Sequence, residues 1–126
     1  MSKSRDVPRP LKRSPRPLKR SEYAITFISR EAQKGWTDCL AMARNATVDA
    51  WDALTTQPAT ESPRLYRLRG DMRYGTYQGR TYERYQYKIT DGARIWYFVE
   101  PGAKGTKCAG TVLLERCTPG HPKQTE

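Results

Sequence analysis

The chain has 126 residues, which suits one domain, and 23 lysines and arginines against 13 aspartates and glutamates give a formal net charge of +10. This balance favours polyanions over membranes as partners, and no run of about 18 apolar residues is present to span a bilayer. The absence of an apolar segment behind the basic N-terminus argues against a signal peptide. The 3 cysteines and 1 histidine match no familiar zinc spacing. We therefore expect a cytoplasmic protein with no metal, no cofactor and no membrane contact.

Residues 1–21 hold most of the positive charge, with eight basic residues and one acidic residue. The heptapeptide PRPLKRS at residues 8–14 recurs at residues 15–21. Its prolines oppose a regular helix, and almost nothing apolar is present to be buried. We expect a disordered basic arm at residues 1–21 and a folded domain at residues 22–126. The arm either binds RNA or DNA by counterion release or is a duplicated tail without a role.

Residues 23–29 are aromatic and β-branched and predict a short strand, after which Ser29 suits a helix N-cap. From residue 32 to residue 54, apolar residues recur at helical spacing on one face. Because this span exceeds a typical helix, we expect two helices that break at residues 44–47, where Asn45 suits a C-cap and Thr47 an N-cap. The residues expected to face the core are Ala32, Trp36, Leu40, Ala43, Trp51 and Leu54.

The remaining segments of the domain predict mainly strands. Residues 65–69 alternate, which places Tyr66 and Leu68 on the inner face and Arg67 and Arg69 on the outer face. Residues 70–79 hold three glycines and predict a loop or a loose hairpin. Two strands, at residues 82–89 and 93–99, flank a Thr-Asp-Gly turn signal. The last strand is expected at residues 111–117, before a polar tail.

Two registers are possible for the hairpin around the Thr-Asp-Gly turn. A two-residue turn pairs Ile89 with Arg94 and mixes polar and apolar side chains on both faces. A three-residue loop, with a positive φ at Gly92, pairs Lys88 with Arg94 and collects the apolar side chains on one face. We favour the second register, because a slip of one residue moves every side chain to the other face.

These elements predict an α+β fold, with a helical hairpin on one face of a small, curved, mainly antiparallel sheet of four to five strands. The other face is expected to carry Gln86, Trp96 and five cations: Arg67, Arg69, Arg84, Lys88 and Arg94. Helices cannot cover this face without burying charge, so it is open or meets an anionic partner. It either binds nucleic acid through cations and stacking rings or is a solvated face with ordinary salt bridges.

A face of this kind can also cleave RNA without a metal ion. The sequence has no glycine-rich phosphate loop, zinc-protease helix motif, nucleophile elbow or paired strand carboxylates. In RNA, a 2′-hydroxyl can attack its own phosphate when a base accepts its proton, cations stabilise the phosphorane and an acid protonates the leaving 5′-oxygen. A lysine or a tyrosine can serve as the base, and clustered arginines can stabilise the charge.

Several short motifs, by their order and spacing, resemble those of RelE/ParE-type toxins of type II toxin–antitoxin systems. The helical half carries SRxAxxGW from residue 29 and AWDxLxxxP from residue 50. The strand half carries LRG from residue 68, ERYQYK from residue 83, GARIWY from residue 92 and HPK from residue 121. The resemblance covers residues 23–126 and implies a RelE/ParE-like fold and a small, acidic or partly disordered antitoxin as partner. In the RelE branch it implies inhibition of translation by cleavage of mRNA on the ribosome.

The resemblance also implies roles for single residues. Arg94 corresponds to the arginine that stabilises the phosphate in RelE-like ribonucleases, and Lys88 is the lysine of the preceding strand. The family pattern ends in an arginine and a tyrosine, where this chain offers Arg116, His121 and Lys123. The candidate catalytic residues are Arg94, Lys88, Arg84 and His121. The candidate nucleic-acid-binding residues are Arg67, Arg69, Arg73, Arg80, Trp96 and Lys123.

Two other functions stay open at this stage. A ParE-like chain would inhibit DNA gyrase without nuclease activity, and a chain that lacks the final tyrosine of the family pattern can be a nucleic-acid-binding module without toxicity. His121 either acts as an acid or base, since imidazole titrates near neutral pH, or is an ordinary residue of the tail.

Overall fold

The computed structural model describes residues 17–103, 105 and 107–120. Most of the predicted arm, and the tail residues His121 and Lys123, therefore lie outside the described residues. In chain order the elements are β2 (Tyr23–Phe27), α1 (Arg30–Met42), α2 (Arg44–Thr56), β3 (Leu65–Arg67), a 3-10 turn (Gly70–Met72), β4 (Tyr74–Tyr77), β5 (Arg80–Glu83), β6 (Tyr85–Lys88), β7 (Arg94–Pro101) and β8 (Gly110–Thr118).

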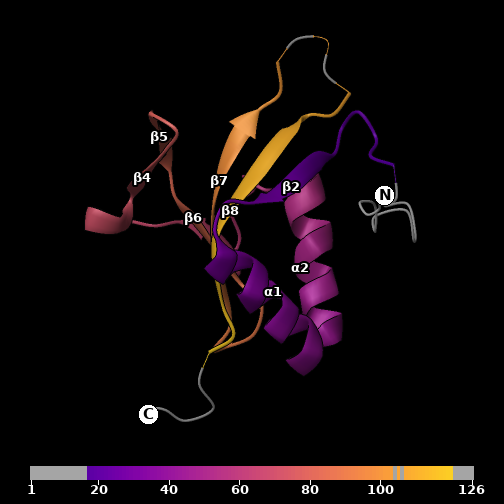
Figure 1. Ribbon diagram of the computed structural model, residues 1–126, viewed down its shortest axis with the longest axis vertical. Coiled ribbons are helices and arrows are strands. Elements are labelled where there is room, and N and C mark those ends of the chain that lie inside the picture. Colours follow the sequence, from indigo (N-terminus) through magenta and orange to yellow (C-terminus); the bar gives the residue numbers. More distant parts are fainter. Residues whose placement is uncertain (1–16, 104, 106, 121–126) are drawn as a thin grey trace, which may run out of the picture.

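The strands form two sheets, and the two helices lie against one face of the larger sheet (Figure 1). The larger sheet has five strands in the order β2-β8-β7-β6-β3. Its β2–β8 pair is parallel, and its other pairs are antiparallel. The smaller sheet is the β4–β5 hairpin, which projects on the side away from the helices (Figure 1). The predicted α+β class, with a helical hairpin on a mainly antiparallel sheet, is confirmed.

Ser29 begins helix α1 as predicted. Its Oγ accepts a hydrogen bond from the backbone N–H of Ala32 at 2.9 Å and donates one to the carbonyl oxygen of Glu115 at 2.8 Å. Glu115 is the extra residue of a β-bulge in β8, between the residues that pair with Trp96 and Tyr97. The N-cap thus fixes the start of α1 to the bulge.

A single residue, Ala43, separates the two helices, with a φ of −149° and a ψ of 66°. The break therefore lies one residue before the expected segment, and both residues expected to cap it, Asn45 and Thr47, lie inside α2. The Thr47 hydroxyl donates to the carbonyl oxygen of Ala43 at 2.8 Å. The predicted capping roles are wrong because the threonine side chain binds the preceding turn of its own helix.

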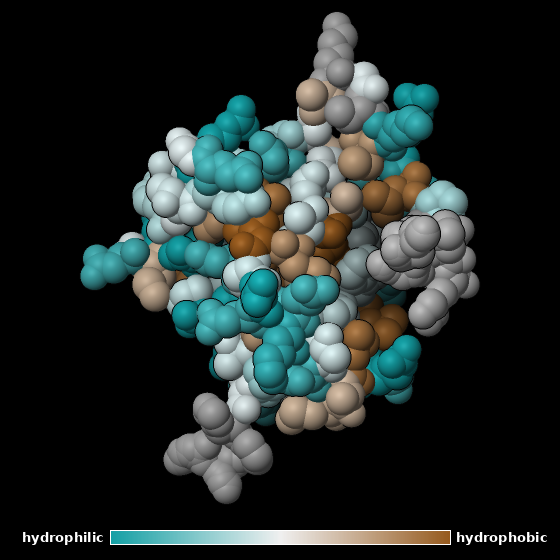
Figure 2. Space-filling view, viewed as in Figure 1, coloured by the Kyte–Doolittle hydropathy of each residue, from teal (hydrophilic) through white to brown (hydrophobic). Residues whose placement is uncertain are grey.

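The core lies between the helices and the larger sheet, and its fully buried side chains include Leu54, Ile95, Tyr97, Val112 and Leu114. Trp51 was expected in this core but is 37% exposed, with its ring centroid 5.5 Å from that of Trp36. Ala50 and Leu54, one helical turn apart, face the sheet instead, and Trp51 is rotated from Ala50 by about 100° around the helix axis. Figure 2 shows that hydrophobic residues exposed on the viewed face are interrupted by hydrophilic ones.

The hairpin between β6 and β7 has the favoured register, in which Lys88 lies directly across from Arg94. The three-residue loop is closed by the Thr90 hydroxyl, which accepts a hydrogen bond from the backbone N–H of Ala93 at 3.0 Å. The positive φ expected at Gly92 is wrong, because the described residues with positive φ do not include it. The threonine side chain closes the loop without a left-handed residue.

Strand β3 has the opposite phase to the one expected. Leu65 is buried, with 3% of its surface exposed, and Tyr66 pairs with Gln86. Since residues two apart share a face, Tyr66 lies on the same face as Gln86 and Lys88, and Arg67 lies on the face of the core. The inward orientation predicted for Tyr66 is therefore wrong, as is the place of Arg67 beside Lys88.

Of the loop or loose hairpin expected at residues 70–79, the structure has a hairpin, β4–β5, which extends to Glu83 and whose tight turn includes Gln78 with a φ of 50°. The single strand expected at residues 82–89 is interrupted at Arg84. The β4–β5 hairpin folds over the end of the sheet that carries Phe98, and the Tyr82 ring stacks on the Phe98 ring at 5.3 Å. Phe98 is fully buried, so the sheet face opposite the helices is covered at this end.

Candidate nucleic-acid interface

The sheet face opposite the helices is uncovered away from the β4–β5 hairpin, and six side chains from four strands lie there. We call this set the open face: Tyr66, Gln86, Lys88, Arg94, Trp96 and Arg116. The register aligns four of them in one row across the sheet, in the order Tyr66, Gln86, Trp96, Arg116. Lys88 and Arg94 form the adjacent pair of facing residues. Residues distant in sequence thus form one continuous surface.

Hydrogen bonds run along this row. Trp96 Nε1 donates to Gln86 Oε1 at 2.7 Å, and Gln86 Nε2 donates to Tyr66 Oη at 2.8 Å. The phenol oxygen of Tyr66 is therefore an acceptor, and its proton makes no hydrogen bond with any described residue. The Lys88 Nζ lies 5.6 Å from the Tyr66 ring centroid, and the Arg116 guanidinium carbon lies 5.2 Å from the Trp96 ring centroid. These contacts position the Tyr66 hydroxyl, the Lys88 amine and the Arg116 guanidinium on the open face.

The three cations of the open face, Lys88, Arg94 and Arg116, form no ion pair with a carboxylate in the described part of the chain. Arg94 makes one long hydrogen bond, from Nη1 to the carbonyl oxygen of Thr90 at 3.5 Å. Like charges directly across two strands destabilise the pair. An anion that contacts several of these cations relieves the repulsion and gains charge-assisted hydrogen bonds.

Arg84, a candidate catalytic residue, lies at the covered end, where its guanidinium is engaged. Its Nε and Nη2 donate to the two carboxylate oxygens of Glu115 at 2.7 and 3.0 Å. Its Nη1 donates to the carbonyl oxygens of Met72 and Tyr74 at 2.9 and 3.2 Å. Its guanidinium carbon lies 5.3 Å from the Trp96 ring centroid, and 11% of its side chain is exposed. Arg84 thus joins the bulge of β8 to the start of the β4–β5 hairpin.

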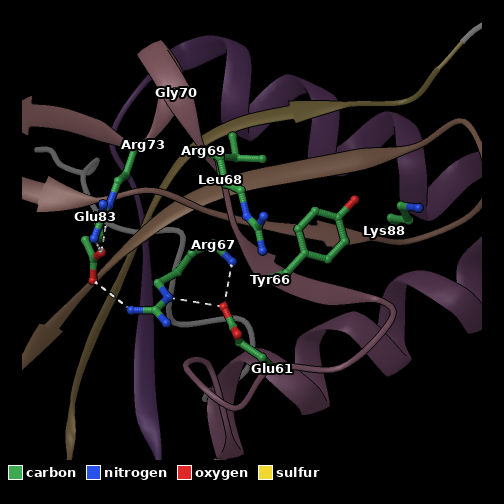
Figure 3. A pocket seen from close by; sticks show the side chains of 9 residues that line it. All are labelled: Glu61, Tyr66, Arg67, Leu68, Arg69, Gly70, Arg73, Glu83 and Lys88. Atoms are coloured by element: carbon green, nitrogen blue, oxygen red, sulfur yellow. Dashed lines mark hydrogen bonds and ion pairs between the residues drawn. The ribbon is translucent and has the colours of Figure 1, made fainter.

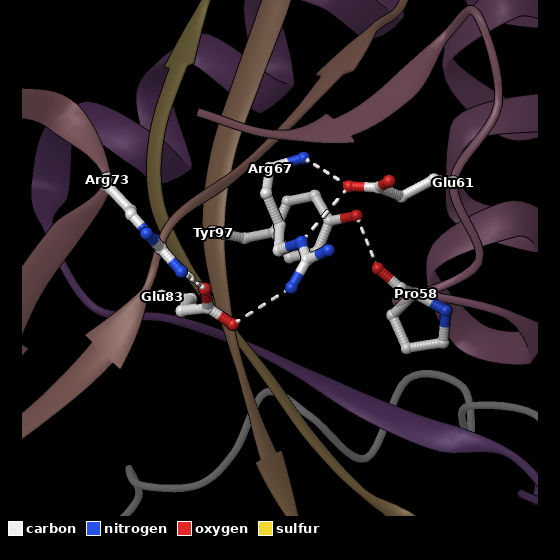
Figure 4. A network of polar contacts seen from close by, with 6 residues as sticks. All are labelled: Pro58, Glu61, Arg67, Arg73, Glu83 and Tyr97. Atoms are coloured by element: carbon white, nitrogen blue, oxygen red, sulfur yellow. Dashed lines mark hydrogen bonds and ion pairs between the residues drawn. The ribbon is translucent and has the colours of Figure 1, made fainter. Parts of the chain in front are cut away.

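Three candidate nucleic-acid-binding arginines form ion pairs away from the open face. Figure 4 shows Arg67 between two carboxylates, with Nε 3.1 Å from Glu61 Oε2 and Nη1 3.4 Å from Glu83 Oε1. Arg73 Nη2 lies 3.2 Å from Glu83 Oε2, and Arg80 pairs with a glutamate of β7 at 3.0 Å. Hydrogen bonds from the backbone and side chain of Arg67 lower the pKa of Glu61. These arginines are already charge-balanced.

A pocket of about 770 Å³ opens beside edge strand β3 (Figure 3). Tyr66 and Lys88 line it and also belong to the open face, so the pocket extends that face around β3. The pocket contains Arg69, which forms no ion pair in the described part of the chain. Glu61 and Glu83 also line it, so the pocket is less attractive to phosphate than the open face.

The structure therefore brings together three of the predicted site residues, Lys88, Arg94 and Trp96, on one surface. The sequence prediction missed Tyr66 as a site residue because it assigned the wrong phase to β3. Treating Leu65 as the inward residue would have found it. Arg116 was considered only as a substitute for the C-terminal family residue. The bulge at Glu115 shifts the alternation of β8, so the pattern alone does not place Arg116 beside Trp96.

Comparison of this chain with protein-family models, with curated proteins and with solved structures finds no match. In the described part of the chain, neither helix has the length and apolar character needed to cross a bilayer. Nor do three or more metal-ligating side chains cluster among residues 17–103, 105 and 107–120. The function must therefore be argued from the open face itself.

Proposed function

We propose that this chain is a metal-independent endoribonuclease that cleaves mRNA on the ribosome, as the toxin of a type II toxin–antitoxin pair. The observation that carries the proposal is the open face, where a tyrosine hydroxyl shares one surface with three cations that have no carboxylate partner among the described residues. The observed arrangement of helices and strands is compatible with the RelE/ParE-like resemblance of the motifs.

Substrate binding begins with the cations. Lys88, Arg94 and Arg116 together match the charge of a phosphodiester and its neighbours, and each phosphate contact releases counterions from the RNA. The Trp96 ring already has the guanidiniums of Arg84 and Arg116 close to it, at 5.3 and 5.2 Å. We therefore assign Trp96 to positioning Arg116 rather than to stacking on a base.

The chemistry uses four side chains. Lys88 acts as the base toward the 2′-hydroxyl, whose oxygen attacks the adjacent phosphorus. Arg94 and Arg116 stabilise the added negative charge of the phosphorane. Tyr66 donates its proton to the leaving 5′-oxygen, because Gln86 holds its oxygen as an acceptor and leaves that proton free to reach a ligand. The products are a 2′,3′-cyclic phosphate and a 5′-hydroxyl.

The same surface suits an acidic antitoxin. Arg67 and Arg84 do not need antitoxin carboxylates, because Glu61, Glu83 and Glu115 already pair with them. Carboxylates of the antitoxin are expected instead to meet the three cations of the open face, where they block the RNA site. Expression of this chain alone then arrests growth in the cytoplasm, and coexpression of the antitoxin relieves the arrest.

Primer extension on cellular mRNA after induction tests the proposal. The wild-type chain should create new 5′-ends within codons, and Arg94→Ala and Lys88→Ala should abolish them. Arg80→Ala is the matched control, because this arginine is exposed and pairs with Glu100 away from the open face. Loss of plasmid supercoiling without new ends would indicate gyrase inhibition. RNA binding by a folded, harmless chain would indicate a binding module, and either result would contradict the proposal.

A further inference from the structure

Two buried thiols meet between α1 and β8, on the side of the sheet that the helices cover. Cys39 Sγ and Cys117 Sγ are 3.6 Å apart, although the two residues are 78 positions apart in the sequence. Cys39 is 2% exposed and Cys117 is 4% exposed. Neither residue belongs to the open face, so the proposed nuclease chemistry does not explain the pair.

A glycine brings the two sulfurs together. Helix α1 crosses β8 at Gly35, where an added Cβ would clash with the carbonyl group of Cys117. Cys39 lies one helical turn after Gly35 and therefore on the same side of the helix. The close backbone approach at Gly35 carries the Cys39 side chain to Cys117, and the contact is a consequence of helix–strand packing.

A small oxidant can reach Cys39, one thiol of this pair. A cavity of about 200 Å³ is lined by Cys39 and also by Met42 and Pro119. A molecule the size of water occupies about 30 Å³ in the liquid, so hydrogen peroxide fits this cavity. The Cys117 side chain hydrogen-bonds Cys39 and lowers the pKa of the Cys39 thiol, while the pKa of Cys117 is raised. Cys39 is therefore the thiol of the pair that more readily becomes the nucleophilic thiolate.

We propose that Cys39 and Cys117 are a reversible redox modification site, which a peroxide closes to a disulfide. The Cys39 thiolate attacks one peroxide oxygen, the O–O bond breaks, and the released hydroxide takes up a proton to leave as water. The Cys117 sulfur then attacks the sulfenic sulfur of Cys39, the S–O bond breaks, and a second water carries away the hydroxyl group and the thiol proton. Two thiols are oxidised and one peroxide is reduced.

The disulfide joins helix α1 to β8, the strand that also carries Arg116 of the open face. Bond formation requires the sulfurs to approach by about 1.5 Å, since a disulfide is about 2 Å long. Cys117 directly follows Arg116 in β8 and pairs with Ile95, which lies between Arg94 and Trp96. A disulfide across a 78-residue separation restricts the unfolded chain strongly, so we expect a rise in melting temperature of about 10 °C.

The test uses the full reduced chain, treated with equimolar hydrogen peroxide under native conditions. Of 3 thiols in the chain, one should remain, and the mass should fall by two hydrogen atoms. Peptide mapping should show Cys39 joined to Cys117, and the melting temperature should rise and then return after reduction with dithiothreitol. Cys108→Ser is the matched control and should show the same link and the same rise.

Cys39→Ser should lose both the link and the rise in melting temperature. The mapping of the wild-type chain decides the question even if that variant folds poorly. Oxygen added to Cys39 without a link to Cys117 would overturn the proposal. So would crosslinks that pass only through Cys108, with an unchanged melting temperature.

Discussion

Arg84 was a candidate catalytic residue in the sequence, whereas its contacts in the structure indicate a structural role. Replacing Arg84 distinguishes these two roles. Arg84→Met removes the bidentate ion pair with Glu115 and the hydrogen bonds to the carbonyl oxygens of Met72 and Tyr74. Methionine keeps an unbranched apolar side chain against the Trp96 ring. The variant therefore removes the polar contacts while it retains much of the packing.

The expected cost can be estimated from the burial of the pair. Removing one partner of a buried ion pair costs about 3–5 kcal/mol. The Glu115 side chain is 29% exposed, and the solvent around its carboxylate lowers this cost. The two carbonyl oxygens lose their donor, at about 1 kcal/mol each or less because they lie near solvent. We expect a loss of about 3 kcal/mol in the free energy of unfolding, which a domain of ordinary stability survives.

Urea denaturation measures this loss as a lower midpoint with an unchanged m-value. The double variant Arg84→Met/Glu115→Leu should recover most of the stability, because it removes the carboxylate left without a partner. RNA cleavage, measured at a temperature where the Arg84→Met variant is folded, should stay near the wild-type rate. A variant with normal stability and no cleavage would refute the structural role of Arg84.

Three further predictions follow from the open face, the core and the arm. Arg94→Ala should lower single-turnover cleavage by about 10²–10³-fold at an unchanged melting temperature, and adding Lys88→Ala should cost less than the product of the single effects if both act on one phosphate. An intact rate in Lys88→Ala would remove this lysine from the mechanism. Burial raises the pKa of Tyr97, so stability is complete below the unfolded phenol pKa of about 10 and falls as the pH rises above it. Urea midpoints between neutral and alkaline pH should fall less steeply for Tyr97→Phe than for Tyr74→Phe, whose ring is exposed; equal slopes would contradict this assignment. Deleting residues 1–21 should leave the melting temperature unchanged and flatten the salt dependence of RNA binding, since up to about eight cations leave. An unchanged salt slope would exclude an electrostatic role of the arm.

The register between β6 and β7 was predictable because only one pairing separates polar from apolar side chains. That pairing placed Lys88 opposite Arg94, as the structure has it. The Ser29 N-cap was predictable for a similar reason, since the signal is local and its geometry needs only the next turn of helix. Both features depend on a few neighbouring residues, although two other local expectations, the caps at Asn45 and Thr47 and the positive φ at Gly92, were wrong.

The phase of β3 was not predictable from its pattern. The segment from Leu65 to Leu68 has apolar residues at both ends, and either alternation places one of them inward. Pairing with β6 selects Leu65, because its partner Tyr87 is buried in the core. This long-range choice decides that Tyr66, and not Arg67, reaches the open face.

Contacts between segments far apart in the sequence also could not be predicted from the sequence pattern. The ion pair between Arg84 and Glu115 depends on two irregularities. A bulge in β8 inserts Glu115, and the break between β5 and β6 places Arg84 outside both strands. The meeting of Cys39 with Cys117 depends on the close packing at Gly35. Hydrophobic periodicity indicates neither contact, since each contact joins residues far apart along the chain.

Cleavage of an mRNA that carries one 2′-deoxynucleotide tests whether the 2′-hydroxyl of the message is the nucleophile. The purified chain is incubated with ribosomes programmed with an all-ribose message, and the cleaved bond is mapped. We expect a 2′,3′-cyclic phosphate and a 5′-hydroxyl at that bond, and no cleavage once the 2′-hydroxyl of its upstream nucleotide is removed. Cleavage of the deoxy message at the same bond, or a 3′-hydroxyl with a 5′-phosphate, would show water as the nucleophile and contradict this expectation.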